Sequence, residues 1–301
     1  MRFVLDDDQR DLAAALEGLL VSSDTVAVAR AWADGDSAPG LALWKRLTDL
    51  GLTVLASEAG PVEVCLGFEA LGRHAVPGPW VESAAYLPLA LGHEVEGVAT
   101  LALPPHVPLA LDADVADLVY VGTTPARLDG DLRVSVDRTR RLFPVTATDA
   151  ALGSHEPVEV DHRAFDLAVL ATAAQLLGAG ERVLADSVTY VTQRKQFGRE
   201  IGSYQAIKHA LADVRIALDF ARPLVLGAAL DEVPASAAKI AAGDAAYLAA
   251  RTGLQVHGAI GYTAEFDLSL WITKIRALLT AWGTPAVHRA RLLTTLSETA
   301  R

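Results

Sequence analysis

The sequence predicts a mainly α-helical protein with a small β domain near the middle of the chain. Apolar residues recur at helical spacing before residue 97 and after residue 161, whereas residues 98–160 carry short apolar runs between Pro, Asp and Gly. With 301 residues, 51% of them apolar, the chain can bury a core. We therefore predict an N-terminal helical domain (1–97), a β subdomain (98–160) and a C-terminal helical bundle (161–301).

Leucine spacing predicts short helices in the N-terminal unit. One is expected over residues 6–21 and another over residues 41–50. Repeated Pro and Gly at residues 72–80 predict a turn, after which a further helix is expected over residues 82–91.

Apolar runs at residues 98–103, 116–121 and 141–145 predict the strands of the β subdomain. We expect about five or six short strands, which is near the lower limit for covering one hydrophobic face unaided. The sheet should therefore pack against helices.

The C-terminal unit begins with a long apolar stripe typical of a core helix in a bundle. The stripe consists of Leu167, Leu170, Ala174, Leu177, Leu184, Val188 and Val191. A second helix is expected after Ser203 as its N-cap, with inward-facing Ile207, Leu211, Val214, Leu218 and Val225. Pro234 ends that helix, and three more are expected over residues 236–256, 267–279 and 285–298.

Charge and cysteine content exclude several classes of protein. A formal net charge of −11 argues against a nucleic-acid partner, which needs a basic face. The single Cys65 excludes an internal disulfide and a cysteine-based zinc site, so we assign it to packing and predict no metal site. The acidic start is unlike a signal peptide, and the apolar run at 167–179 is shorter than the roughly 20 residues of a membrane span. We therefore expect a cytoplasmic protein without a membrane span.

Two segments go beyond generic helical patterns. In the first, Gln193-Arg-Lys-Gln-Phe-Gly-Arg-Glu-Ile-Gly-Ser-Tyr-Gln205, Arg194 offers a planar fork for a pyrophosphate, and Gly198 and Gly202 let the backbone approach a ligand. The second is Gln255-Val-His-Gly-Ala-Ile-Gly-Tyr-Thr-Ala-Glu265. In sequence, order and separation, both segments resemble signatures of the acyl-CoA dehydrogenase family.

The resemblance covers most of the chain and implies an acyl-CoA dehydrogenase-like fold. That fold has an N-terminal helical domain, a central β subdomain that is reduced here, and a C-terminal four-helix bundle, assembled as tetramers. In the family, the matching residues contact an FAD bound mainly by the neighbouring subunit; here they are Arg194, Gln196, Phe197, Gln205, Gln255, Gly258 and Gly261. Taken alone, Arg194 would be a cation at a helix C-terminus, and the two glycines would serve a tight turn.

The resemblance also implies a glutamate base, because α-proton removal must accompany hydride transfer to the flavin. In many family members the glutamate precedes Gly-Thr after the penultimate helix, where this chain has Trp282, expected to be a core or interface anchor. In others it begins the first bundle helix, where this chain has His162. No residue is confidently assigned as catalytic. His162 is the candidate base, although a solvent-facing histidine beside the helix cap Asp161 is the simpler explanation.

The β region lacks family segments that hold the flavin ring, namely threonine-glutamate-proline, glycine-serine-aspartate and a tryptophan-centred strand. Residues 137–142 nevertheless resemble a later β-domain segment. Within it, Arg138, Arg140 and Arg141 are expected to form a solvated charge run rather than a CoA phosphate site.

We therefore expect a partner of a longer acyl-CoA dehydrogenase subunit in a heterotetramer that shares FAD across an interface. The chain resembles the lesser subunits of heterotetrameric steroid side-chain dehydrogenases. The resemblance implies α,β-dehydrogenation of an acyl-CoA thioester, with electron-transfer flavoprotein as acceptor. The alternatives are a self-sufficient FAD enzyme that forms homo-oligomers and a flavin-free scaffold of the same fold. The sequence identifies neither the acyl group nor the flavin stoichiometry.

Overall fold

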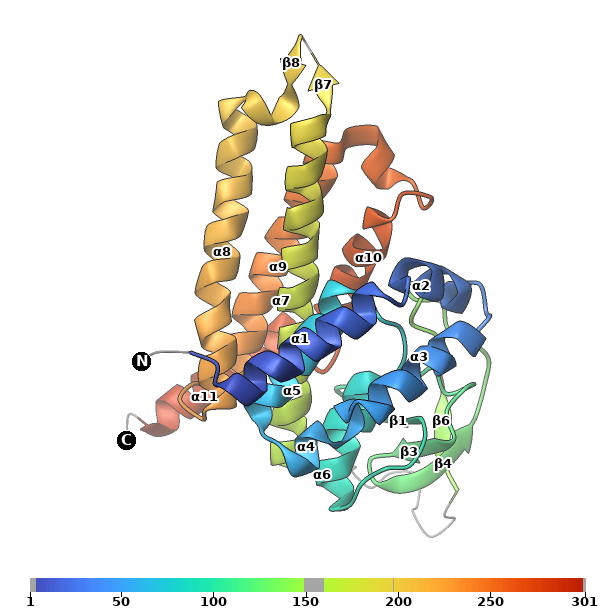
Figure 1. Cartoon of the computed structure of the whole chain (residues 1–301). Coiled ribbons are helices and arrows are strands. Elements are labelled where there is room, and N and C mark those ends of the chain that lie inside the picture. The colour runs from blue at the N-terminus through green and yellow to red at the C-terminus, as the bar shows by residue number, and fades with distance from the viewer. Residues whose placement is uncertain (1–3, 149–159, 197, 300–301) are drawn as a thin grey trace.

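The computed structural model describes residues 4–148, 160–196 and 198–299. Helices occupy the chain up to residue 91, strands lie between residues 99 and 147, and helices dominate again from residue 162 (Figure 1). The predicted mainly helical fold with a small β-sheet and a C-terminal helical domain is confirmed. The exact domain boundaries at residues 97 and 160 stay a prediction.

The N-terminal helices include each of the three that the sequence predicted. They are α1 (Asp7–Val21), α2 (Thr25–Ala33), α3 (Ala38–Asp49), η1 (Leu52–Val54), α4 (Leu55–Glu58), α5 (Pro61–Arg73), a π-helical turn η2 (Glu82–Tyr86) and α6 (Leu87–Leu91). A capping box starts α1: Asp6 accepts the backbone N–H of Gln9, whose side chain accepts the backbone N–H of Asp6. Cys65 is buried in α5, as expected of a packing residue.

The β subdomain consists of short strands that depend on the helices beside them. The strands are β1 (Ala99–Ala102), β2 (Ala110–Leu111), β3 (Leu118–Val121), β4 (Thr124–Leu128), β5 (Leu142–Phe143) and β6 (Val145–Ala147). One sheet has the order β1-β3-β4-β6, with β1 and β3 parallel and the other pairs antiparallel, and β2 pairs separately with β5. Every residue of β1 is buried, and the N–H of Ala99 donates to the hydroxyl of Ser83 in η2 (3.2 Å).

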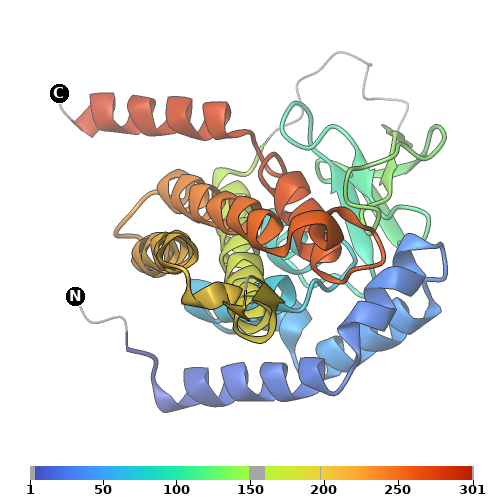
Figure 2. The same cartoon turned by 90° about the horizontal axis from the view of Figure 1, so that it is seen from above.

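A helical bundle forms the rest of the chain. It contains α7 (His162–Gln193), a hairpin of β7 (Lys195–Gln196) and β8 (Arg199–Glu200), η3 (Ile201–Ser203), α8 (Gln205–Ala229), α9 (Ala235–His257), η4 (Gly258–Tyr262), α10 (Leu268–Leu278) and α11 (Pro285–Thr299). Helices α5, α8, α9 and α10 pack around α7 (Figure 2). By length and composition α7 could cross a membrane, but 89% of its apolar window is buried inside the protein, as in a core helix.

Two sequence predictions about the bundle are wrong. Val188 is 43% exposed, unlike the other residues of its stripe. Ser203 is not the N-cap of α8, because its hydroxyl donates to the carbonyl of Glu200 (2.6 Å) and the helix begins after Tyr204. The N-cap residue of α8 is Tyr204, which has an extended backbone and makes no capping hydrogen bond with its side chain.

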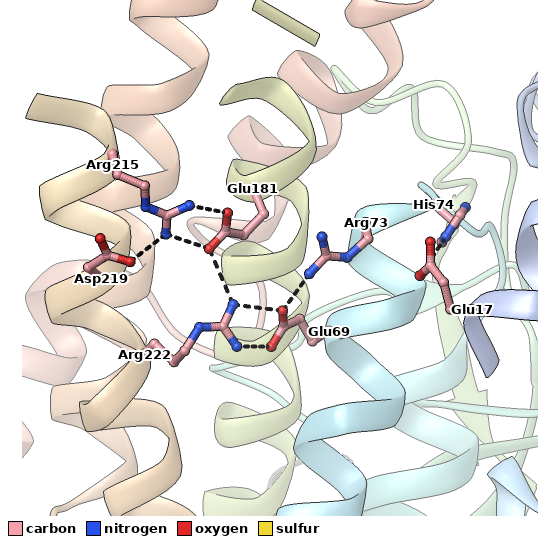
Figure 3. A network of polar contacts seen from close by, with 8 residues as sticks. All are labelled: Glu17, Glu69, Arg73, His74, Glu181, Arg215, Asp219 and Arg222. Atoms are coloured by element: carbon pink, nitrogen blue, oxygen red, sulfur yellow. Dashed lines mark hydrogen bonds and ion pairs between the residues drawn. The ribbon is translucent and has the colours of Figure 1, made fainter. Parts of the chain in front are cut away.

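An ion-pair network ties α8 to both α5 and α7 (Figure 3). Arg222 donates to both carboxylate oxygens of Glu69 (2.8 and 2.9 Å) and to Glu181 (3.2 Å). Arg215 forms a two-pronged pair with Glu181 (2.6 and 2.7 Å). Burial alone would raise the pKa of Glu181, but the hydrogen bonds and charges of the two arginines outweigh burial and hold it below its usual value.

We expect Glu181→Gln to reduce the free energy of unfolding by about 1–3 kcal/mol at pH 7, because two guanidinium groups lose their shared carboxylate. Since the folded-state pKa of Glu181 is depressed, its stabilisation is present above the unfolded value of 4.5 and lost as pH falls through the lower folded value. Urea denaturation at pH 7 and pH 3.5 tests this. Glu94→Gln, on an exposed loop, is the matched control. A pH-independent difference between Glu181→Gln and the native protein would contradict the prediction.

Candidate functional site

The first motif forms a hairpin beyond the ends of α7 and α8 (Figure 1). After α7 ends, the N–H of Arg194 donates to the carbonyl of Tyr190 (2.9 Å), and the carbonyl of Arg194 accepts the N–H of Ile201 (2.9 Å). Strands β7 and β8 pair antiparallel in between, and Gly198 turns the chain with φ of +81°. This left-handed backbone favours glycine. Local geometry thus holds Arg194 at the base of the hairpin.

The polar side chains of this motif face outward. Arg194, Gln196 and Gln205 are all exposed, and no hydrogen bond or ion pair with other residues that the structure describes engages the Arg194 guanidinium. Arg199, in contrast, lies over the ring of Tyr204 (3.9 Å). Phe197 lies outside the described residues. The hairpin therefore presents unused donors at the surface.

Gly202 lies against the end of α7, and its expected approach to a ligand stays a prediction. A Cβ at this position would lie 3.0 Å from the carbonyl oxygen of Val191. Glycine therefore lets η3 pack closely on the last turns of α7, which is a structural role.

The second motif lies at the same end of the bundle. The ring of His257 stacks on Tyr190 (4.2 Å between centroids), and Phe266 packs beside it (5.3 Å). Tyr190 also provides the carbonyl that binds the N–H of Arg194. One turn of α7 therefore anchors both motifs, which are far apart in sequence.

Within the second motif, exposure differs between the predicted contact residues. Gln255 is exposed, Gly258 is half-buried with φ of +63°, and Gly261 is buried. A Cβ on Gly261 would lie 3.1 Å from Cβ of His257, so this glycine permits the tight turn. A ligand across this end of the bundle would meet a guanidinium fork and three amide side chains, a donor set suited to a diphosphate. Because these groups are exposed, this chain would cover only one side of it.

His162 lies far from both motifs. It is exposed at the first residue of α7, after Asp161, whose side chain caps the helix by accepting the N–H of Ala164 (2.9 Å). The 32 residues of α7 separate it from the hairpin by roughly 48 Å. The predicted cap is confirmed, and the structure does not bring His162 to the hairpin.

Trp282 is buried in the core, as expected of an anchor, with 2% exposure and φ of +56°. Its ring packs against Tyr86 and Phe165, at centroid distances of 5.1 and 6.0 Å. Its indole N–H donates to a carboxylate oxygen of Glu82 (3.2 Å). At the position where the resemblance led us to expect a glutamate, the chain therefore has a buried ring that binds another carboxyl group.

Sequence reasoning missed Glu82, which is only 2% exposed and lines a cavity of about 420 Å³. Burial raises the pKa of Glu82, and the weaker influence of Arg140 on the cavity wall lowers it. The one signal in the sequence was a single carboxyl group within the apolar segment 80–91.

The arginine run at residues 138–141 is not uniformly solvated. Arg141 is buried and lies 3.4 Å from Asp112 and 3.3 Å from Asp114, so the predicted solvated charge run is wrong for this residue. Arg138 is exposed and pairs with Asp34 (3.1 Å), and Arg140 lines the Glu82 cavity.

Comparison with known sequences identifies one family. A family model described as acyl-CoA dehydrogenase, C-terminal domain, matches residues 158–296. The chain is 30% identical over 293 residues to acyl-CoA dehydrogenase IpdE2 of Mycobacterium tuberculosis, covering 89% of this chain and 91% of that protein. It is also 30% identical over 241 residues to IpdE2 of Mycolicibacterium smegmatis, covering 74% of this chain and 75% of that protein.

Solved structures share the fold at lower sequence identity. Butyryl-CoA dehydrogenase from Megasphaera elsdenii matches with a TM-score of 0.77 and 19% identity over 100% of both chains. A chain of the ChsE4-ChsE5 complex from Mycobacterium tuberculosis matches with a TM-score of 0.75 and 21% identity over 99% of both chains. A variant of the Tcur3481-Tcur3483 steroid ACAD matches with a TM-score of 0.83 and 20% identity, over 98% of this chain and 99% of that chain.

Proposed function

The chain belongs to the acyl-CoA dehydrogenase family, and on that basis we propose that it lends FAD contacts to a longer catalytic partner subunit in a cytoplasmic heterotetramer. The observation that carries this proposal is the exposed donor set at the hairpin end of the bundle, with the Arg194 guanidinium unengaged by the residues that the structure describes. Exposed donors fit a cofactor that a second chain covers from the other side. In a one-chain site, they would line a cavity.

In this proposal each residue has a defined contact. Arg194 binds the pyrophosphate through its two-pronged fork, and the amides of Gln196, Gln205 and Gln255 bind polar edges of the cofactor. Phe197 packs on its ring system, and Gly258 and Gly261 bring the backbone of the second turn close. Bound FAD supplies the acceptor for the β hydride of the substrate.

The catalytic base belongs to the partner in this proposal. Trp282 has no group that removes a proton at neutral pH, and its buried indole N–H is already bound to Glu82. His162 is exposed at the opposite end of α7 from the hairpin.

The complex dehydrogenates the α,β bond of an acyl-CoA thioester, and electron-transfer flavoprotein receives the electrons. A steroid side-chain CoA ester is the substrate class that we favour. The similar fold of the steroid ACAD Tcur3481-Tcur3483 supports this choice.

Flavin content tests the proposed function. We expect no stoichiometric FAD in the purified chain alone, and less than one FAD per chain after co-expression with the longer dehydrogenase encoded nearest to it. Arg194→Ala should weaken FAD binding by the complex about tenfold or more, because a charge-assisted contact with phosphate is lost. Flavin absorbance and the FAD-to-chain ratio measure both effects.

Arg127→Ala is the control, since Arg127 is an exposed arginine on β4, in the β subdomain rather than in the bundle. It should leave the flavin content unchanged. Stoichiometric FAD in the chain alone would instead identify a self-sufficient enzyme. A complex without flavin would identify a scaffold.

A further inference from the structure

The Glu82 cavity has a mostly apolar wall that contains one carboxyl group and several other polar side chains. The cavity of about 420 Å³ lies between the β subdomain and the segment that joins α10 to α11. Its wall includes Val107, Leu109, Leu111, Leu142 and Trp282. Arg140 and Arg276 also line it. A hydrocarbon group would lose its water shell on entering such a space.

Glu82, a residue of the cavity wall, has one carboxyl oxygen without a hydrogen-bond partner among the described residues. One carboxyl oxygen accepts the indole N–H of Trp282 (3.2 Å), and the other has no hydrogen-bond partner among the residues that the structure describes. Glu82 also forms no ion pair with any residue that the structure describes. Glu82 is 2% exposed, and burial raises its pKa more than the charge of Arg140 on the cavity wall lowers it, so the neutral form of the carboxyl group is favoured. Neutral Glu82 has an O–H donor without an acceptor.

We propose that this cavity binds a bulky apolar group bearing one acceptor oxygen, to which the Glu82 carboxyl donates a hydrogen bond. A ring ketone fits, because its oxygen accepts hydrogen bonds and donates none, while its carbon skeleton contacts the apolar wall. Glu82 is then a specificity-determining residue that distinguishes a keto-substituted group from its hydrocarbon analogue. Binding to this cavity does not rest on the proposed function, because the cavity residue Trp282 packs on Phe165 at the start of α7, at the far end of that helix from the hairpin with the proposed FAD contacts.

Two bicyclic probes of the same shape test the proposal on the full chain, without flavin or partner. They are 1-decalone and its analogue in which an exocyclic methylene replaces the carbonyl oxygen, titrated by ligand-observed NMR. We expect the native chain to bind the ketone about five- to tenfold more tightly, which is the effect of one neutral hydrogen bond.

Two substitutions of Glu82 distinguish the effect of its hydrogen-bond donor from the effect of its side-chain volume. Glu82→Gln should keep the preference for the ketone, because its amide retains an N–H donor and an oxygen for Trp282. Glu82→Met should abolish it. Glu94→Met, at an exposed loop position, should leave the preference unchanged.

Equal affinity of the native chain for the two probes would overturn the proposal, as would a preference that survives in Glu82→Met. If neither probe binds, the cavity does not take apolar groups and the proposal is overturned. The comparison of probes in the native chain needs no variant, so a poorly folded Glu82→Met does not prevent a decision. Flavin content is measured separately, so failure of the shared-FAD proposal gives a different result from failure of this one.

Discussion

Gly178→Ala is expected to reduce the free energy of unfolding by at least about 3 kcal/mol, because it adds a methyl group where α5 and α7 are in backbone contact. A Cβ on Gly178 would lie 2.0 Å from the carbonyl oxygen of Glu69 in α5. The contact is reciprocal, since a Cβ on Gly72 of α5 would lie 2.0 Å from the carbonyl oxygen of Gln175 in α7. Both obstacles are backbone atoms, so relief requires the two helices to separate. The loss of packing then spreads along the core helix.

Gly18→Ala provides the matched control, because a Cβ at Gly18 of α1 would have no heavy atom within 4 Å. This exposed helical position should become more stable by about 0.5–1 kcal/mol, owing to the lower backbone entropy of unfolded alanine. The same substitution should therefore change stability in opposite directions at the two sites. Chemical denaturation of both variants and of the native chain measures these changes in the free energy of unfolding. A Gly178→Ala protein as stable as the native one would show that α5 and α7 do not meet through their backbones.

Apolar periodicity predicted the helices well because their apolar stripes are buried. It misplaced Val188 because periodicity shows which residues share a face, whereas burial depends on which neighbours extend that far. Val188 lies in the last turns of α7 and is exposed. Similarly, Ser203 has a residue type that favours capping, but the short hairpin before it directs its hydroxyl to Glu200.

Buried polar groups were the least predictable feature, because their partners are distant in sequence. Glu82 and Trp282 are 200 positions apart, and Asp112 and Arg141 are 29 apart. No local pattern of charge reveals such pairs. Sequence motifs did locate the candidate FAD contacts, and the structure adds that the described ones lie at one end of the bundle. Their contact with FAD stays a prediction.

Trp282→Glu would place a carboxylate at the position where the sequence resemblance predicts a catalytic glutamate, and we expect it to destabilise the chain instead of supplying a base. The substitution removes an indole ring that is 2% exposed and packs on Tyr86 and Phe165, at a cost of about 3–5 kcal/mol. It also deprives Glu82 of its hydrogen-bond donor and puts a second carboxyl group beside it. Two neighbouring buried carboxyl groups do not both ionise readily, so burial and repulsion together raise their pKa values.

The pH dependence of Trp282→Glu identifies this cause. Burial already raises the folded-state pKa of Glu82 above its usual 4.5, and the new carboxyl group should titrate in the same direction. The free energy of unfolding is therefore unaffected by these two groups below about pH 4.5 and falls as pH rises through their raised folded-state pKa values. The difference in free energy of unfolding between the native chain and Trp282→Glu should consequently be larger at pH 7 than at pH 4. Trp282→Phe keeps an aromatic ring but removes the N–H donor and part of the buried indole, so it should cost about 1–3 kcal/mol, less than Trp282→Glu at pH 7. Urea denaturation of the three proteins at both pH values measures these differences. A Trp282→Glu protein equally destabilised at pH 4 and pH 7 would mean that the new carboxylate reaches solvent, and that this position is open enough to hold a base.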